Sequence, residues 1–271
     1  MKKFLCRKEL LYERYDYTFS MLFHHCTVEQ IENQVRLKLP WNVFLAGTTA
    51  GRSRMTDCST GKQYLLTKGG WWLIPKNCEV FYDLRFEQEI LNIQFSLEYF
   101  PGMDLFEKDN AIHTGKDPGL VAALHAELLK TENIFSMLKV RSMMTTLAAG
   151  LKPEQNGEIR LDHPFVGQLQ FLLKNLSAAD SVKTIAFGMQ MTPEAFSRKF
   201  HQIFHCPPKK FFDMLLANRA IEYLHSGRNS SETAAELHFS SVFHFSRFIR
   251  RMTGKNITEF RRWDPQEINK D

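Results

Sequence analysis

The last third of the chain contains an internal repeat, and this repeat constrains the fold more than any other feature. Residues 191–212 resemble residues 239–261 in their caps, aromatic residues and basic residues. A repeat of this kind indicates two copies of one supersecondary unit. Aligned positions of the two copies differ by 48 in residue number before the turn within each copy (234 − 186) and by 49 after it (245 − 196). The turn of the second copy is therefore one residue longer. The aligned pairs are Ala186 with Ala234, Met191 with Phe239, Thr192 with Ser240, Phe196 with Phe245, Ser197 with Ser246 and Arg198 with Arg247.

Each copy carries the signals of two helices joined by a tight turn. Thr192 is a predicted N-cap followed by Pro193 at the first helical position, and Ser240-Ser241 opens the matching helix. We expect Asp162 to cap the helix before the repeat, and Ser230 or Ser231 to cap the short helix that begins the second copy. The Phe-Ser-Arg triplet places Phe on the core face and directs Ser and Arg outward near the helix start. This arrangement is typical of a helix-turn-helix, which presents that part of its second helix to DNA bases.

The charge is unevenly distributed. Residues 160–271 carry 16 Lys and Arg against 11 Asp and Glu, whereas residues 1–159 carry 19 of each. The whole net charge of +5 therefore belongs to the C-terminal part. A basic half joined to a neutral half suggests a partner that is a polyanion, although +5 is modest and is also compatible with a solvated face.

Residues 33–100 have the pattern of a β domain. Short runs rich in β-branched and aromatic residues alternate with turn signals, which favours a sandwich or a small barrel. The piece LTKGGWWLIPKNCEVFYD resembles the strand-turn-strand of cupin-type jelly-roll barrels. The region has no His, so the resemblance to metal-dependent cupins does not extend to their ligands, and we expect no metal, cofactor or catalytic residue. Barrel mouths are natural ligand sites, and the predicted effector pocket, whose aromatic members could equally be core, is Trp41, Arg52, Tyr64 and Trp72.

Helical periodicity begins after the strands. Residues 117–150 predict two amphipathic helices with a break near Thr131, and such a pair could pack on the barrel or on a second copy. We favour a homodimer, because operator-binding proteins often use twofold symmetry. The predicted fold class is α+β with two domains. The domains are a cupin-like ligand-sensing and dimerisation domain over 1–150 (barrel about 1–105, helices about 117–150), a linker over 151–162 and an all-α domain over 163–271.

The remaining composition points to a cytoplasmic protein. Five scattered cysteines without paired spacing fit reduced thiols better than a disulfide framework. Charges interrupt the N-terminus before any apolar stretch forms, so no signal peptide is expected, and no apolar run approaches the length of a membrane span.

The repeat and the segment around it resemble the AraC/XylS family of bacterial transcriptional regulators. The resemblance covers residues 163–263 and is strongest in FSRFIRRMTGKNITEFRR, which begins at Phe245. In that family the second helix of each unit enters the major groove. The resemblance therefore implies base contacts from Glu194, Ser197 and Arg198 in the first copy and from Val242, Phe243, Ser246 and Arg247 in the second. Phosphate contacts are expected from Lys199, Arg250, Arg251, Lys255 and Arg261.

Five positions depart from the family pattern, and one of them is Leu216, which stands in the linking helix where Arg or Lys is common. Gln190 and His238 stand where the turns usually have Gly, His205 follows the first recognition helix in place of Gly, and Ile257 replaces a usual Pro. Gly adopts a positive φ without steric cost, so these replacements predict strained or differently shaped turns.

The sequence predicts a DNA-binding transcriptional regulator, not an enzyme, controlled by a small-molecule effector in the barrel. Its expected partners are double-stranded DNA, the effector and a second copy, with RNA polymerase as a further candidate and no membrane. Two alternatives are a cupin-type enzyme fused to a DNA-binding module and a regulator controlled by protein contact.

Overall fold

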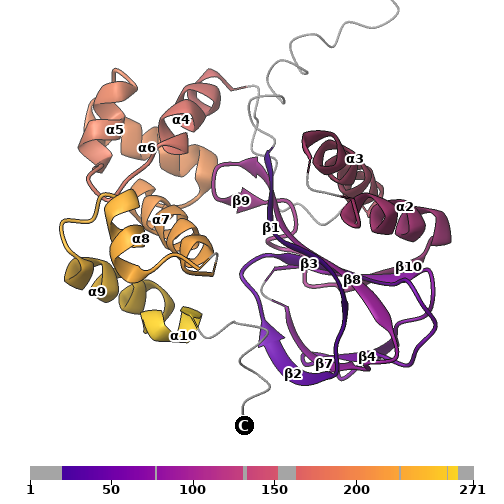
Figure 1. The fold of residues 1–271 in the computed structure, drawn as a ribbon. Helices are drawn as coiled ribbons and strands as arrows, with labels where there is room; N and C mark the ends of the chain where they lie inside the picture. The colour runs from indigo at the N-terminus through magenta and orange to yellow at the C-terminus, as the bar shows by residue number, and fades with distance from the viewer. Residues whose placement is uncertain are drawn as a thin grey trace, which may run out of the picture. The chain divides into compact units, whose positions relative to one another are not determined.

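The computed structural model describes residues 20–76, 78–130, 133–151, 163–225, 227–254 and 256–261. The predicted linker lies largely outside these residues. The described chain divides into two compact units: residues 20–98 with 103–151, and residues 99–102 with 163–261. We call the first the β domain and residues 163–261 the helical domain. The strands precede the helices in the chain (Figure 1), and the predicted two-domain α+β fold class is confirmed.

The larger sheet of the β domain has six strands in the order β1-β8-β3-β6-β10, with β9 paired to β8. All neighbouring strands in this order pair antiparallel. The strands are β1 (Ser20–Gln30), β3 (Asn42–Gly47), β6 (Gly70–Ile74), β8 (Glu89–Phe100), β9 (Met103–Asp104) and β10 (His113–Lys116).

The smaller sheet has four antiparallel strands in the order β2-β7-β4-β5. They are β2 (Asn33–Lys38), β4 (Arg54–Asp57), β5 (Gln63–Leu65) and β7 (Glu79–Leu84). From β1 to β4 and again from β5 to β8 the chain alternates between the two sheets, as in the predicted sandwich or small barrel. Every apolar run read from residues 33–100 forms one of these strands.

The two helices that follow β10 cover one face of the larger sheet. These are α2 (Pro118–Leu128) and α3 (Ile134–Leu151), and Figure 1 shows β2, β4 and β7 on the opposite side of that sheet. Strand alternation explains this layering, because side chains two apart share one face. Leu91, Ile93, Phe95 and Leu97 of β8 join the core beneath the helices, together with Val121 and Met144.

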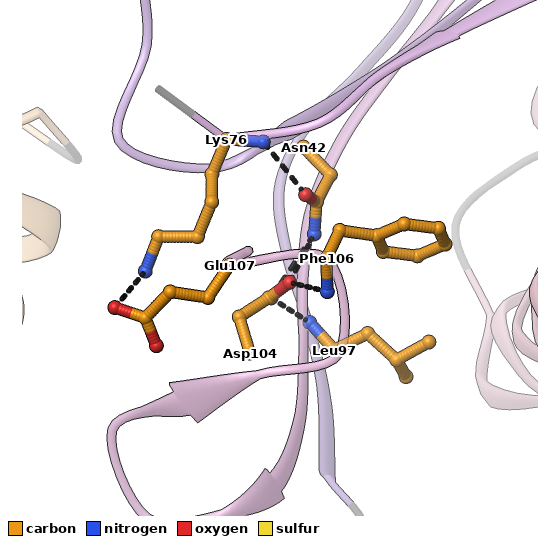
Figure 2. A network of polar contacts seen from close by, with 6 residues as sticks. All are labelled: Asn42, Lys76, Leu97, Asp104, Phe106 and Glu107. Carbon is orange, nitrogen blue, oxygen red and sulfur yellow. Dashed lines mark hydrogen bonds and ion pairs between the residues drawn. The ribbon is translucent and has the colours of Figure 1, made fainter. Parts of the chain in front are cut away.

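A buried polar network holds β9 against β8 and β3 (Figure 2). Asp104 is 4% exposed, and its carboxylate accepts hydrogen bonds from Leu97 N at 2.7 Å, Phe106 N at 2.8 Å and Asn42 Nδ2 at 3.0 Å. Asn42 Oδ1 in turn accepts from Lys76 N at 2.9 Å, and Lys76 Nζ lies 4.0 Å from Glu107 Oε1. Burial raises the pKa of the Asp104 carboxyl, and the donor nitrogens oppose this effect by stabilising the carboxylate.

The helical domain contains α4 (Pro164–Lys174), α5 (Val182–Gly188), α6 (Pro193–Phe204), α7 (Pro208–His225), α8 (Ser230–Glu236), α9 (Val242–Thr253) and α10 (Ile257–Arg261). Two predicted caps are corrected, and a third is narrowed to one residue. His163, not Asp162, caps α4, and its ring accepts from Phe165 N. Asn229, not Ser230 or Ser231, caps α8 in a capping box with Glu232. Ser241 alone caps α9.

Asp104→Asn should lower the free energy of unfolding by about 2–4 kcal/mol, because an amide N–H₂ would face a buried backbone N–H that has lost its acceptor. Urea denaturation measures this change. Glu87→Gln, the same carboxylate-to-amide change at an exposed site, serves as the control. Equal stability of the two variants would show that the network does not hold the domain together.

Candidate nucleic-acid interface

The helical domain contains two copies of one helix-turn-helix. We call α5–α6 the first motif and α8–α9 the second motif. The starts of α5 and α8 differ by 48 residues (230 − 182), and the starts of α6 and α9 differ by 49 (242 − 193). The predicted extra residue in the second turn is therefore confirmed. It shifts the caps by one position, so Thr192 corresponds to Ser241 and not to Ser240.

Each turn contains a residue with left-handed backbone, and neither is Gly. Gln190 has a φ of 54° and His238 has a φ of 55°. In the first motif Met191 N donates to Ala186 O at 2.9 Å and Gln190 N donates to Phe187 O at 2.9 Å. This pair of bonds is a Schellman motif, which satisfies carbonyls at a helix end and requires the left-handed residue.

The second motif repeats these bonds at the corresponding positions. Phe239 N donates to Ala234 O at 2.8 Å and His238 N donates to Ala235 O at 3.0 Å. The departures from Gly therefore leave the two turns with the same geometry. Both turns keep the left-handed residue that Gly would supply, so of the two predicted outcomes the structure supports backbone strain, because a Cβ in this conformation is disfavoured by about 1–2 kcal/mol.

Buried residues set the position of the second helix in each motif. Ala186 and Ala234 are at most 3% exposed, as expected for small residues where helices cross. Phe196 and Phe245 are fully buried, which confirms the core role of the Phe in the Phe-Ser-Arg triplet. The centre of the Phe239 ring lies 5.2 Å from that of the Phe245 ring, so Phe239 anchors the second turn to the buried face of α9.

The predicted base-reading residues occupy the first two turns of α6 and α9. Glu194 and Arg198 are exposed on α6, and Val242, Phe243 and Arg247 are exposed on α9. Ser197 and Ser246 are half-buried at equivalent positions. Phe243 is 66% exposed, so its ring is available for contact at the start of α9.

Comparison with known proteins identifies this pair of motifs. Residues 185–262 match the model of a helix-turn-helix domain family of the AraC type, and this span runs from α5 into the segment after α10. The match covers the second motif, the long helix α7 and all of the first motif except the first three residues of α5. The C-terminal part of this chain is therefore an AraC-type helix-turn-helix domain.

Solved structures that align with this chain are distant in sequence. ToxT from Vibrio cholerae O395 aligns at 11% identity over 90% of this chain and 96% of that chain, with a TM-score of 0.47. An AraC-type regulator from Chromobacterium violaceum aligns at 25% identity over 38% of this chain and 95% of that chain, with a TM-score of 0.33. A search of curated proteins gave no match.

The predicted phosphate-binding residues of this domain differ in their surroundings. Arg250 is exposed, whereas Arg251 Nη2 lies 3.6 Å from Asp213 Oδ2 and its guanidinium is 5.4 Å from the Phe248 ring. Lys199 Nζ lies 5.5 Å from the Phe165 ring centre. Lys255 lies outside the described residues, and Arg261 ends α10.

Sequence comparison of the motifs missed His244. It is exposed on the first turn of α9 between Phe243 and Phe245, and its Nδ1 lies 2.6 Å from Ser240 Oγ. Its counterpart in the first motif is Ala195, so the repeat gave no signal for it. The Arg247 guanidinium lies 5.6 Å from the Phe243 ring, which orders both side chains at the same exposed end.

The predicted effector residues do not all meet at one cavity. Trp41 and Trp72 are each 2% exposed, and Trp41 Nε1 donates to Gln94 Oε1 at 2.8 Å. Tyr64 lines a cavity of about 590 Å³ in the β domain, and Arg52 is exposed in the loop before β4, apart from that lining.

The described residues contain no group of three or more His, Cys, Asp or Glu side chains placed to hold a metal ion. None of the described helices combines the length and apolarity that a membrane crossing needs.

His238→Gly should raise the free energy of unfolding by about 0.5–1 kcal/mol. Removal of the Cβ relieves the left-handed residue, and the greater freedom of Gly in the unfolded chain offsets part of this gain. Thermal unfolding followed by circular dichroism measures the difference. Ala235→Gly, an exposed position inside α8, should instead lose about 1 kcal/mol. No gain at His238 would contradict the assigned strain.

Proposed function

We propose that this AraC-type DNA-binding transcriptional regulator reads its operator through the exposed ends of α6 and α9 and responds to a small molecule in its β domain. The observation that carries the DNA part is the equivalence of Arg198 and Arg247. Each is exposed at the sixth position of the second helix of its motif. Two equivalent reading helices suit successive stretches of the major groove.

The chemistry of each reading end suggests which base edges it contacts. Arginine can donate two hydrogen bonds to guanine O6 and N7, and a carboxylate such as Glu194 can accept from the cytosine amine. Val242 and Phe243 supply apolar surface for a thymine methyl group. The Ser246 hydroxyl donates to Val242 O at 2.9 Å, so it retains acceptor capacity only.

Phosphate contacts would add affinity without sequence information. Arg250 is the strongest candidate among the proposed residues, because it is exposed next to the reading face. Arg251 would have to exchange its contact with Asp213 for a phosphate. Lys199, Lys255 and Arg261 remain proposals on the family resemblance alone.

Arg198→Ala or Arg247→Ala should weaken binding to DNA selected by the wild-type chain by about tenfold or more, because each arginine–guanine pair contributes roughly 1–3 kcal/mol of discrimination. Fluorescence anisotropy with selected and random DNA measures this. Random DNA should bind both variants nearly as before. Arg54→Ala removes the same charge at an exposed site of the β domain and is the control. Unchanged affinity for selected DNA in both variants would refute the assignment.

A cavity in the β domain supports effector control. Its lining residues lie far from the reading helices in the sequence. Its volume of about 590 Å³ lies in the range of small-molecule sites. A ligand there can alter promoter occupancy only if it binds two arrangements of the protein with different affinities. Control by a protein partner is the alternative, and the buried indoles of Trp41 and Trp72 are compatible with it.

A homodimer through α3 is part of the proposal. Ile134, Phe135 and Leu138 at the start of α3 are 70%, 72% and 52% exposed, while Val140 and Met144 of the same helix are buried. Residues three and four apart are neighbours on a helix, so these side chains form one apolar patch. Such patches mark interaction sites, and a second copy would make the contact symmetric. Contact with RNA polymerase and action in the cytoplasm are also proposed, as consequences of regulating transcription.

Phe135→Glu should convert the protein to a monomer, because the interface would have to bury a carboxylate. Sedimentation velocity measures the mass. Phe86→Glu changes another exposed phenylalanine, 57% exposed in the turn before β8, and should leave the mass unchanged. An unaltered dimer in the Phe135 variant, or a monomeric wild-type protein, would contradict this interface.

A further inference from the structure

The cavity in the β domain has two walls that are distant in sequence. One wall is the β4–β5 hairpin, and the other is the segment between β9 and β10. The lining includes Asp57, Lys62 and Tyr64 from the hairpin and Lys108, Asp109 and His113 from the other wall. The strand register places Tyr64 opposite Met55, which is fully buried, so this part of the hairpin faces inward.

The carboxylates of the lining are buried and already accept hydrogen bonds from their own loops. Asp57 is 6% exposed, and it accepts from Ser59 N at 2.8 Å, Ser59 Oγ at 2.7 Å and Thr60 Oγ1 at 2.7 Å. Burial is the largest single influence on the pKa of Asp57, and it raises this pKa. The hydrogen bonds together outweigh burial, so the pKa of Asp57 is lowered. Asp109 is 5% exposed and accepts from Ala111 N at 2.9 Å and lies 2.7 Å from His113 Nε2.

The cations of the lining are exposed, in contrast to the carboxylates. Lys62 and Lys108 both reach solvent at the cavity. The Lys62 ammonium lies 4.9 Å from the Tyr64 ring centre, and no carboxylate among the described residues forms an ion pair with it. An entering ligand therefore meets ammonium groups and a phenol ring before it meets either Asp.

Both walls are held in place before a ligand arrives. In the hairpin, Asp57 N donates to Lys62 O at 2.9 Å and Gly61 N donates to Asp57 O at 2.8 Å. In the other wall, Asp109 N donates to Phe106 O at 3.1 Å, and Phe106 is itself bound to Asp104 through its backbone. A site fixed in this way loses little conformational entropy on binding.

We propose that this cavity binds a small organic anion, a carboxylate or a phosphate ester. Its charged group pairs with Lys62 Nζ, with Lys108 as the second cation, and its apolar body lies along Tyr64 and Ile112. The inference rests on the proposed function only where it makes this anion the effector. The binding site itself follows from the lining.

The test uses isothermal titration calorimetry on the full chain with three probes. Phenylacetate and phenyl phosphate carry the two anionic groups, and phenylacetamide is the neutral match of phenylacetate. Both anions should bind, and phenylacetamide should bind at least about tenfold more weakly, because the ion pair is absent. Binding by one anion alone would identify which of the two groups the site takes and would support the proposal.

Charge removal in the lining provides the second arm. Lys62→Gln should weaken anion binding about tenfold, and Lys62→Arg should restore most of it, because the positive charge is kept. Lys68→Gln, at an exposed lysine outside the lining, is the matched control and should bind as wild type. Lys108→Gln tests the second cation with an expected loss of the same sign, and circular dichroism verifies that each variant is folded.

Three results would overturn the proposal: no binding of either anion, equal binding of phenylacetamide, or unchanged anion binding in Lys62→Gln. Binding of wild-type protein to selected DNA without any probe is measured on the same preparation. Normal DNA binding with no anion binding refutes the anion site alone. If the wild-type protein shows no sequence-specific DNA binding, the proposed function is refuted instead. Anion binding that leaves DNA affinity unchanged refutes the effector role and leaves the site.

Discussion

The left-handed residue after the first helix of each motif is the constraint on which the DNA-binding part of this protein depends. The chain changes direction at Gln190 and again at His238, and a pair of backbone hydrogen bonds stabilises each change of direction. The turn directs α6 and α9 away from the helices that precede them. It also brings Phe239 onto the buried Phe245, so that the opposite face of α9 stays exposed. The reading face therefore follows from a local backbone conformation that the side chains at these positions disfavour.

The β domain depends on a different regularity, the twofold alternation of β8. Alternate residues of this strand meet the core beneath α2 and α3, while Gln94 faces the other way and accepts from Trp41. One strand thus forms part of an apolar core and of a polar inner wall. The Asp104 network then fixes the chain that leaves β8, and the same segment continues into one wall of the cavity.

Much of this architecture follows from local sequence signals. The runs between residues 33 and 100 become strands because β-branched and aromatic residues are bounded by turn residues. β1 was harder to predict, because its register with β8 shifts between Phe23 and His25 and this irregularity breaks the alternation. The caps of α4 and α8 were misplaced by one or two residues, because several neighbouring polar residues can each act as a cap and only the backbone geometry selects one.

The sequence alone determined the repeat, the extra residue in the second turn and the positions of Phe196, Phe245, Arg198 and Arg247. These features are local, since each depends on spacing within one motif. The sequence predicted strained or differently shaped turns at Gln190 and His238, and the tertiary structure decided that both residues adopt left-handed backbone and keep the hydrogen bonds of the turn. It also decided the composition of the cavity, where Lys62 meets a segment more than 40 residues later. Such contacts depend on sheet register and long-range hydrogen bonds, and no short stretch of sequence specifies either.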